Sequence, residues 1–159
     1  FGANEWYLSA IEIAFSIGMM IGGIIMASWG GFNNKTHTMT LSAFGFGICT
    51  FLLGLVPLFW MYLVFMGIIG IVMPMFNTPA TVLLQEKVEE DYLGRVFGVL
   101  TMISTSMMPL GMLVFGPIAD IIAIEWLLIG TGILIFALGF FLLGSKVLIE
   151  AGKPVLLEE

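Results

Sequence analysis

The sequence predicts an all-α membrane protein, because it combines high hydrophobicity, five long apolar segments and positive charge in alternate loops only. Of its 159 residues, 60% are hydrophobic and 10% are charged, whereas about a quarter of the residues of a soluble domain are charged. A soluble domain could not bury this much apolar surface, but a bilayer accommodates it. The strands of a membrane β-barrel would alternate in polarity, and no such alternation is present.

A membrane-spanning helix needs about 20 predominantly apolar residues. Five segments meet this requirement, and they are separated by polar, charged or proline-containing breaks. The predicted helices cover residues 6–29, 39–56, 59–84, 93–117 and 126–144. We expect one partial transmembrane bundle over residues 1–145 and a polar, flexible cytoplasmic tail over residues 146–159. The chain starts without a Met, which suggests a fragment.

Positive charge predicts the orientation of these helices. The first loop, the third loop and the tail hold all the basic residues of the chain: Lys35, Lys87, Arg95, Lys146 and Lys153. Because loops rich in Lys and Arg stay in the cytoplasm, the N-terminus is expected outside and the C-terminus inside. An aromatic belt at the outer boundary agrees with this orientation, since three tryptophans fall there: Trp6, Trp60 and Trp126.

Several functional classes have little support in the sequence. A single cysteine, Cys49, excludes an intramolecular disulfide and a cysteine-based metal site. No basic patch for nucleic acid is present. His37 has no Cys or clustered carboxylate near it and is interpreted as a solvated loop residue. No phosphate loop, nucleophile triad or metal spacing occurs, so we expect neither an enzyme nor a cofactor.

The predicted helices differ in the polarity of their faces. The second and fifth are almost wholly apolar and are expected to be peripheral and lipid-facing. The first helix has a small or polar face, which consists of Ser9, Glu12, Ser16, Gly23 and Ala27. The two prolines of the third helix, Pro74 and Pro79, are expected to bend or break it. This helix has a comparable face, which consists of Gly67, Gly70, Pro74, Asn77 and Thr81. This division fits a bundle around a translocation path, and it also fits a packed bundle without one.

Glu12 is the first candidate functional residue, as a site of proton coupling. A carboxylate within a membrane is costly and by default suggests function. The alternative is that the helix starts later and Glu12 reaches the outer interface. Substrate or cavity candidates come from the third and fourth helices, where hydroxyl, amide and thioether groups could bind a ligand or simply pack between helices: Asn77, Thr81, Thr101, Ser104, Thr105 and Met108.

The third loop and the helix after it resemble a known family. The stretch from Asn77 to Val88 and the Leu-Gly-Arg-Val-Phe-Gly run at 93–98 resemble the loop between helices 10 and 11 of major facilitator superfamily transporters. Residues 108–120 resemble the next helix of the drug–proton antiporter branch that holds the macrolide-efflux proteins. The chain would then be helices 8 to 12 of twelve. The loop at 29–35 departs from the family, since it lacks the acid and Arg pair of the loop motif.

The resemblance implies a function, a location and partners. It implies a proton-coupled exporter of amphipathic drugs such as macrolides in the bacterial plasma membrane, with lipid, a small amphipathic substrate, protons and the missing N-terminal half as partners. The first and fourth helices would lie between the two halves, and the third would line the cavity. The third loop would steady the inward gate, or would only set topology, through Glu89, Glu90, Asp91 and Arg95. A non-transporting scaffold or a truncated, inactive protein is the alternative.

Overall fold

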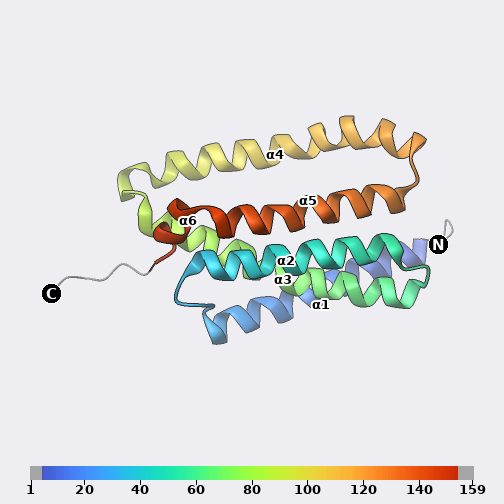
Figure 1. The fold of residues 1–159 in the computed structure, drawn as a ribbon, viewed down its shortest axis with the longest axis horizontal. Coiled ribbons are helices and arrows are strands. Elements are labelled where there is room, and N and C mark those ends of the chain that lie inside the picture. The colour runs from blue at the N-terminus through green and yellow to red at the C-terminus, as the bar shows by residue number, and fades with distance from the viewer. Residues whose placement is uncertain (1–4, 154–159) are drawn as a thin grey trace.

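The computed structural model describes residues 5–153 and contains five helices long and apolar enough to cross a membrane. A short sixth helix follows them. The bounds are α1 Glu5–Trp29, α2 Lys35–Leu55, α3 Phe59–Lys87, α4 Glu90–Ile121, α5 Ile124–Gly144 and α6 Lys146–Ala151. The five long helices run along the same axis and alternate in direction, so that α1, α3 and α5 begin at one end of the molecule (Figure 1).

A glycine turn and an asparagine cap set the start of α2. Gly30 and Gly31 have φ angles of 70° and 80°, which favour glycine over residues with a side chain. The Asn34 side chain then accepts a hydrogen bond from the backbone N–H of Thr36 at 3.0 Å. α2 therefore begins at Lys35, four residues before the predicted start at residue 39, and His37 lies in its first turn rather than in a loop.

α2 lies at the centre of the bundle, between α3 and α5. The expectation that this helix would be peripheral and lipid-facing is wrong. Half of its most apolar stretch is buried inside the chain, including several hydroxyl side chains. The hydroxyls of Thr40, Ser42 and Thr50 each donate to the carbonyl four residues earlier at 2.8 Å. Because these groups are satisfied within their own helix, burying them costs little.

Glycines allow α2 and α5 to approach closely. A Cβ atom on Gly47 would lie 2.7 Å from the backbone nitrogen of Phe136, and one on Gly132 would lie 2.8 Å from the Cα of Phe51. Gly139 lies beneath the ring of Phe44, whose carbons would be 2.9 Å from an added Cβ. α5 buries only this strip, and its other side exposes large apolar side chains, as predicted for a lipid-facing helix.

Glycines also allow α1 and α3 to approach closely. Gly18 and Gly22 are buried, and a Cβ on Gly22 would lie 2.8 Å from the Cα of Ile71. Gly70 of α3 packs against the Gly18 backbone. α3 remains one continuous helix through Pro74 and Pro79, so the break that the prolines predict does not occur.

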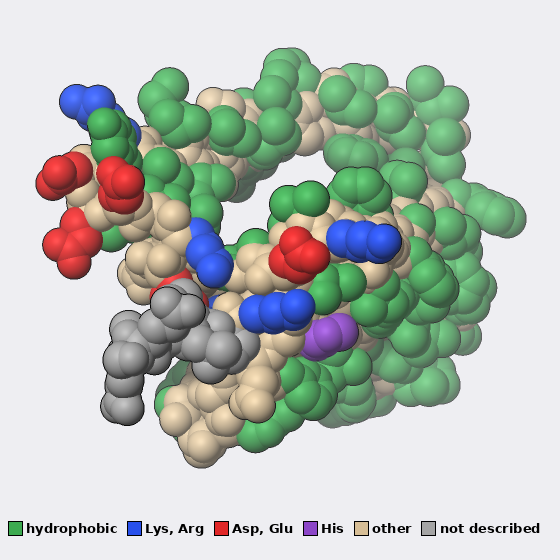
Figure 2. All heavy atoms as spheres, turned by 60° about the vertical axis from the view of Figure 1, so that its left-hand side comes forward, with side chains coloured by type: hydrophobic (Ala, Val, Ile, Leu, Met, Phe, Trp, Pro, Cys, Tyr) green, Lys and Arg blue, Asp and Glu red, His purple; other side chains and the backbone are tan. Residues whose placement is uncertain are grey.

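α4 stands apart from the other long helices. None of its residues is buried, although it is the longest helix of the chain at 32 residues. Figure 2 shows open space between this helix and the rest of the molecule. The same view shows Lys, Arg, Asp and Glu side chains gathered at one end of the bundle, where α2 and α4 begin and α3 ends.

The segment after α5 is folded in part. The predicted flexible tail begins with α6, and Gly152 after it is buried against α2. This part of the expectation was wrong because α6 depends on hydrogen bonds to residues more than 100 positions away, which local composition does not reveal. The rest of the predicted tail, residues 154–159, lies outside the described residues, as do residues 1–4.

Candidate substrate path and proton site

Glu12 lies on an exposed face of α1. The helix begins at Glu5, so Glu12 is in its second turn and does not precede the helix. Ser9 and Ser16 are exposed on the same face. At about 100° per residue this face lies roughly 130° around the helix from the Gly18–Gly22 edge that packs on α3. Among residues 5–153, Glu12 makes no hydrogen bond or ion pair.

Asn77 borders a cavity of about 310 Å³ between α2, α3 and α5. Ser42 and six apolar residues complete its lining: Ala43, Phe46, Met73, Phe76, Ile135 and Leu138. The Ser42 hydroxyl is already bonded to the Thr38 carbonyl, so the Asn77 amide is the polar group of this cavity that can bind something else. Thr81, one turn further along α3, is exposed and does not line this cavity.

The candidates on α4 are exposed along the whole helix. Thr101 donates to its own helix, to the carbonyl of Phe97 at 2.8 Å. Ser104, Thr105 and Met108 also lie at the surface, and Met108 is 68% exposed. A Cβ added to any glycine of this helix would meet nothing within 4 Å. The side of α4 that the sequence marks as a packing face therefore has no partner among the described residues.

The charged third loop makes a different contact from the expected one. Lys35 at the start of α2 forms an ion pair with Glu86 near the end of α3, at 2.5 Å between nitrogen and oxygen. Arg95 lies 5.9 Å from the ring centroid of Tyr92, a cation–π geometry. Within residues 5–153 it forms no ion pair with Glu89, Glu90 or Asp91.

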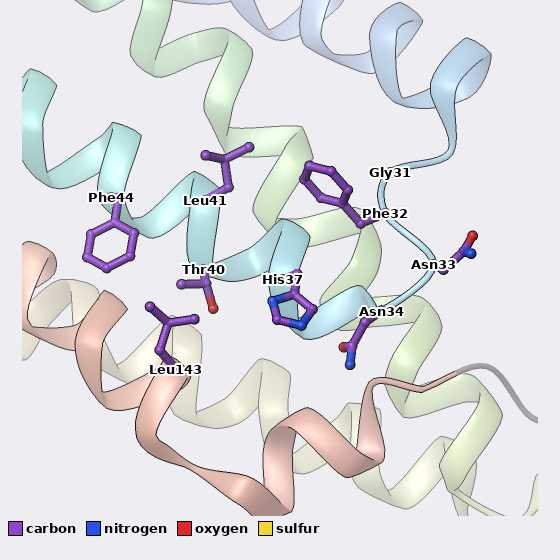
Figure 3. Close-up of a pocket in the computed structure, with 9 residues that line it drawn as sticks. All are labelled: Gly31, Phe32, Asn33, Asn34, His37, Thr40, Leu41, Phe44 and Leu143. Atoms are coloured by element: carbon purple, nitrogen blue, oxygen red, sulfur yellow. The ribbon is translucent and has the colours of Figure 1, made fainter.

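A wider groove opens at the charged end of the bundle. Its volume is about 750 Å³, and its lining comes from the α1–α2 turn, the first turns of α2 and the end of α5 (Figure 3): Gly31, Phe32, Asn33, Asn34, His37, Thr40, Leu41, Phe44 and Leu143. None of the predicted site residues lines it. Asn33, Asn34 and His37 lie near the turn, and the apolar lining comes from Phe32 of the turn, Leu41 and Phe44 of α2 and Leu143 of α5.

The described structure does not bring the predicted residues into one site. The Glu12 face, the Asn77 cavity and the α4 face lie on separate helices, and each of the two faces lacks a cover. Sequence interpretation missed Ser42 and Phe46 as partners of Asn77, although their spacing of four residues on α2 places them on one face. It also missed the Lys35–Glu86 pair, which joins residues 51 positions apart.

Comparison with known proteins finds three curated relatives. Macrolide efflux protein A of Streptococcus pyogenes is 34% identical over 142 residues, which cover 87% of this chain and 35% of that protein. The protein of the same name from a serotype M6 strain of that species matches equally well. Macrolide efflux protein A of Enterococcus faecalis is 34% identical over 70% of this chain. By name these relatives are efflux proteins and not enzymes.

The chain spans about a third of the length of the curated relatives it matches. No family model matches it. No solved structure matches it.

Proposed function

Because the chain is homologous to the macrolide efflux proteins of the major facilitator superfamily, we propose that it forms part of a proton-coupled exporter of amphipathic drugs such as macrolides. It is a multi-pass protein of the bacterial membrane. The proposed exporter works by rocking two halves of a bundle around a central site. This chain supplies five helices of the C-terminal half, which correspond to helices 8 to 12 of the family.

The observation that carries the proposal is the pair of uncovered polar faces on α1 and α4. Ser9, Glu12 and Ser16 on α1 are exposed, as are Thr101 and Ser104 on α4. Polar and ionisable groups rarely face lipid and usually face a protein interior or a water-filled path. An N-terminal half placed against these two faces gives them such an environment.

The proposed orientation is N-terminus out and C-terminus in. Trp6, Trp60 and Trp126 lie at the starts of α1, α3 and α5, which share one end of the molecule, and each is more than 65% exposed. The basic residues occupy the opposite end. The positive-inside rule and the aromatic belt support this assignment together.

Within this scheme each candidate group has a role. Glu12 carries the proton, and the Asn77 amide with Thr81, Thr101, Ser104, Thr105 and Met108 contacts the substrate. Lys35–Glu86 ties α2 to α3 at the cytoplasmic end. The acids at 89–91 and Arg95 are available to charged groups of the other half, where they would steady the inward gate.

Substituting Glu12 by Gln in the exporter tests the proposal. Gln keeps the size of the side chain but cannot bind and release a proton at physiological pH. We expect Glu12→Gln to lower proton-driven macrolide efflux at least tenfold and to remove its dependence on external pH. Efflux is measured as drug accumulation in cells and in proteoliposomes with an imposed pH gradient.

Glu5→Gln is the matched control, since Glu5 is the other acid of α1 and lies in its exposed first turn. It should leave both the rate and the pH profile unchanged. An unchanged rate and pH profile in Glu12→Gln would remove Glu12 from the mechanism. A protein that moves no macrolide in any form would reject the proposed substrate class.

A further inference from the structure

α6 fastens the end of α5 to the start of α2. α6 follows α5 after the single residue Ser145 and runs to the N-terminus of α2. The Asn34 Nδ2 group donates to the Ile149 carbonyl at 2.9 Å, the Thr36 hydroxyl donates to the Leu148 carbonyl at 2.5 Å, and the Lys35 N–H donates to the Gly152 carbonyl at 3.0 Å. These bonds join residues 112 to 117 positions apart in the sequence.

Two side chains and one backbone N–H at the start of α2 donate to carbonyls at the end of α6. The last carbonyls of a helix have no donor within the helix, and the first N–H groups have no acceptor within it. The carbonyl end of α6 carries partial negative charge and the N-terminus of α2 carries partial positive charge, so the two ends attract each other. The Lys35 N–H at the start of α2 and the carbonyls at the end of α6 therefore find partners in each other's segment.

Asn34 serves both helices at once. Its Oδ1 accepts from the Thr36 N–H and caps α2, while its Nδ2 donates to α6. In Figure 3 the Asn34 side chain lies on the side of the turn that faces the α6 ribbon. Thr36 is only 2% exposed, and Gly152 fits so closely that an added Cβ would lie 2.8 Å from the Thr36 nitrogen.

The same pair of helices is also packed tightly elsewhere along its length. At the opposite end, a Cβ on Gly54 of α2 would lie 2.7 Å from the carbonyl oxygen of Glu125, in the first turn of α5. In the middle, Gly47 and Gly132 pack against the backbone of the facing helix. α4 has no comparable contact anywhere along its described length.

We propose that α6 is a strap that holds α2 and α5 together as one rigid unit, so that these two helices move together when the transporter changes state. The movement of this unit during transport rests on the proposed function. The strap itself does not, because it is defined by contacts within the described chain.

Two variants open the strap without removing the start of α2. Asn34→Asp keeps the oxygen that caps α2, since Asp is as good an N-cap as Asn, but it loses the N–H₂ donor to Ile149. Gly152→Ala places a methyl group against Thr36. Gly144→Ala is the matched control, because a Cβ at that glycine meets nothing within 4 Å.

Hydrogen exchange of the membrane protein in lipid nanodiscs measures the effect. We expect Asn34→Asp and Gly152→Ala to raise exchange about fivefold at the amides of Lys35 and residues 146–152, the factor expected for one lost hydrogen bond of typical strength. Exchange in α1 and α3 should stay unchanged, as should all exchange in Gly144→Ala. Unchanged exchange at Lys35 in both variants, or unprotected residues 146–152 in the parent protein, would overturn the strap.

Distances between spin labels test the rigid unit separately. Labels at the exposed positions Leu41 of α2 and Leu143 of α5 should keep one narrow distance with and without a pH gradient, and Asn34→Asp should broaden it. A change in the α2–α5 distance in the parent protein would reject the rigid unit. If the protein transports no drug but the exchange and the α2–α5 distance are as expected, only the proposed function is rejected.

Discussion

α2 and α4 have similar compositions but opposite surroundings. Both carry glycines and hydroxyl side chains within an apolar helix. α2 buries ten residues, whereas α4 buries none. The glycines of α2 at positions 47 and 54 touch the facing backbone, while those of α4 have open space around them. Small residues in a membrane helix therefore indicate a packing face, but not whether its partner belongs to the same segment of chain.

The α2–α5 contact offers the strongest test of this difference. Gly132→Leu should destabilise the folded protein by about 3 kcal/mol, because overpacking of a tight contact costs about 1–3 kcal/mol or more and the Phe51 backbone cannot move aside. Gly130→Leu, two residues earlier on the open side of α5, should change stability by less than about 0.5 kcal/mol. Thermal unfolding in detergent measures both. Equal effects at the two positions would contradict the packing described for α5.

The α4 glycines offer the converse test. Gly111→Leu meets nothing in the described structure, so contacts within this chain predict no loss of stability. In the assembled exporter it should lower drug efflux several-fold, because the proposed N-terminal half packs on this face. The measurement compares efflux with the amount of folded protein in the membrane. Normal efflux by the Gly111→Leu variant would mean that the N-terminal half does not pack on this face of α4.

The smallest effect is expected at the Lys35–Glu86 pair. The two side chains are 19% and 35% exposed, and ion pairs of this kind contribute about 0–1 kcal/mol. Glu86→Gln should therefore lower stability by about 0.5 kcal/mol, and the loss should shrink at high salt. A double-mutant cycle with Lys35→Met isolates the pair. A coupling energy above about 2 kcal/mol would mean that the pair is desolvated more than its exposure indicates.

The sequence predicted the five long helices because hydropathy and breaker residues act locally. The polar turn before Lys35 separates the first two segments, and Pro57 separates the second from the third. The predicted start of α2 was too late because threonines after the Asn34 cap lower the local hydropathy. The central position of α2 could not be predicted in the same way. Hydropathy does not distinguish a lipid partner from an equally apolar helix, and the hydroxyls of Ser42 and Thr50 satisfy themselves within their own helix.

The candidate site was accessible from sequence only in part. The small or polar face of α1 follows from residue spacing, and its exposure in the structure leaves the role of Glu12 a prediction. The cavity at Asn77 could not be predicted, because it needs the relative rotation of α2, α3 and α5. α6 was missed because six residues carry no periodic pattern and the helix is held by Asn34 and Thr36, far away in sequence.

The glycines at the α2–α5 contact have one more consequence, which concerns insertions and deletions. Gly47 and Gly54 are seven residues apart, as are Gly132 and Gly139. Seven residues bring a helix back to within about 20° of the same direction, so each pair keeps one rotational phase along its helix. Adding or removing a single residue between the members of a pair would turn one glycine by about 100° and present a side chain to the facing backbone. Changes of length in these two segments should therefore be far less tolerated than substitutions on their exposed sides.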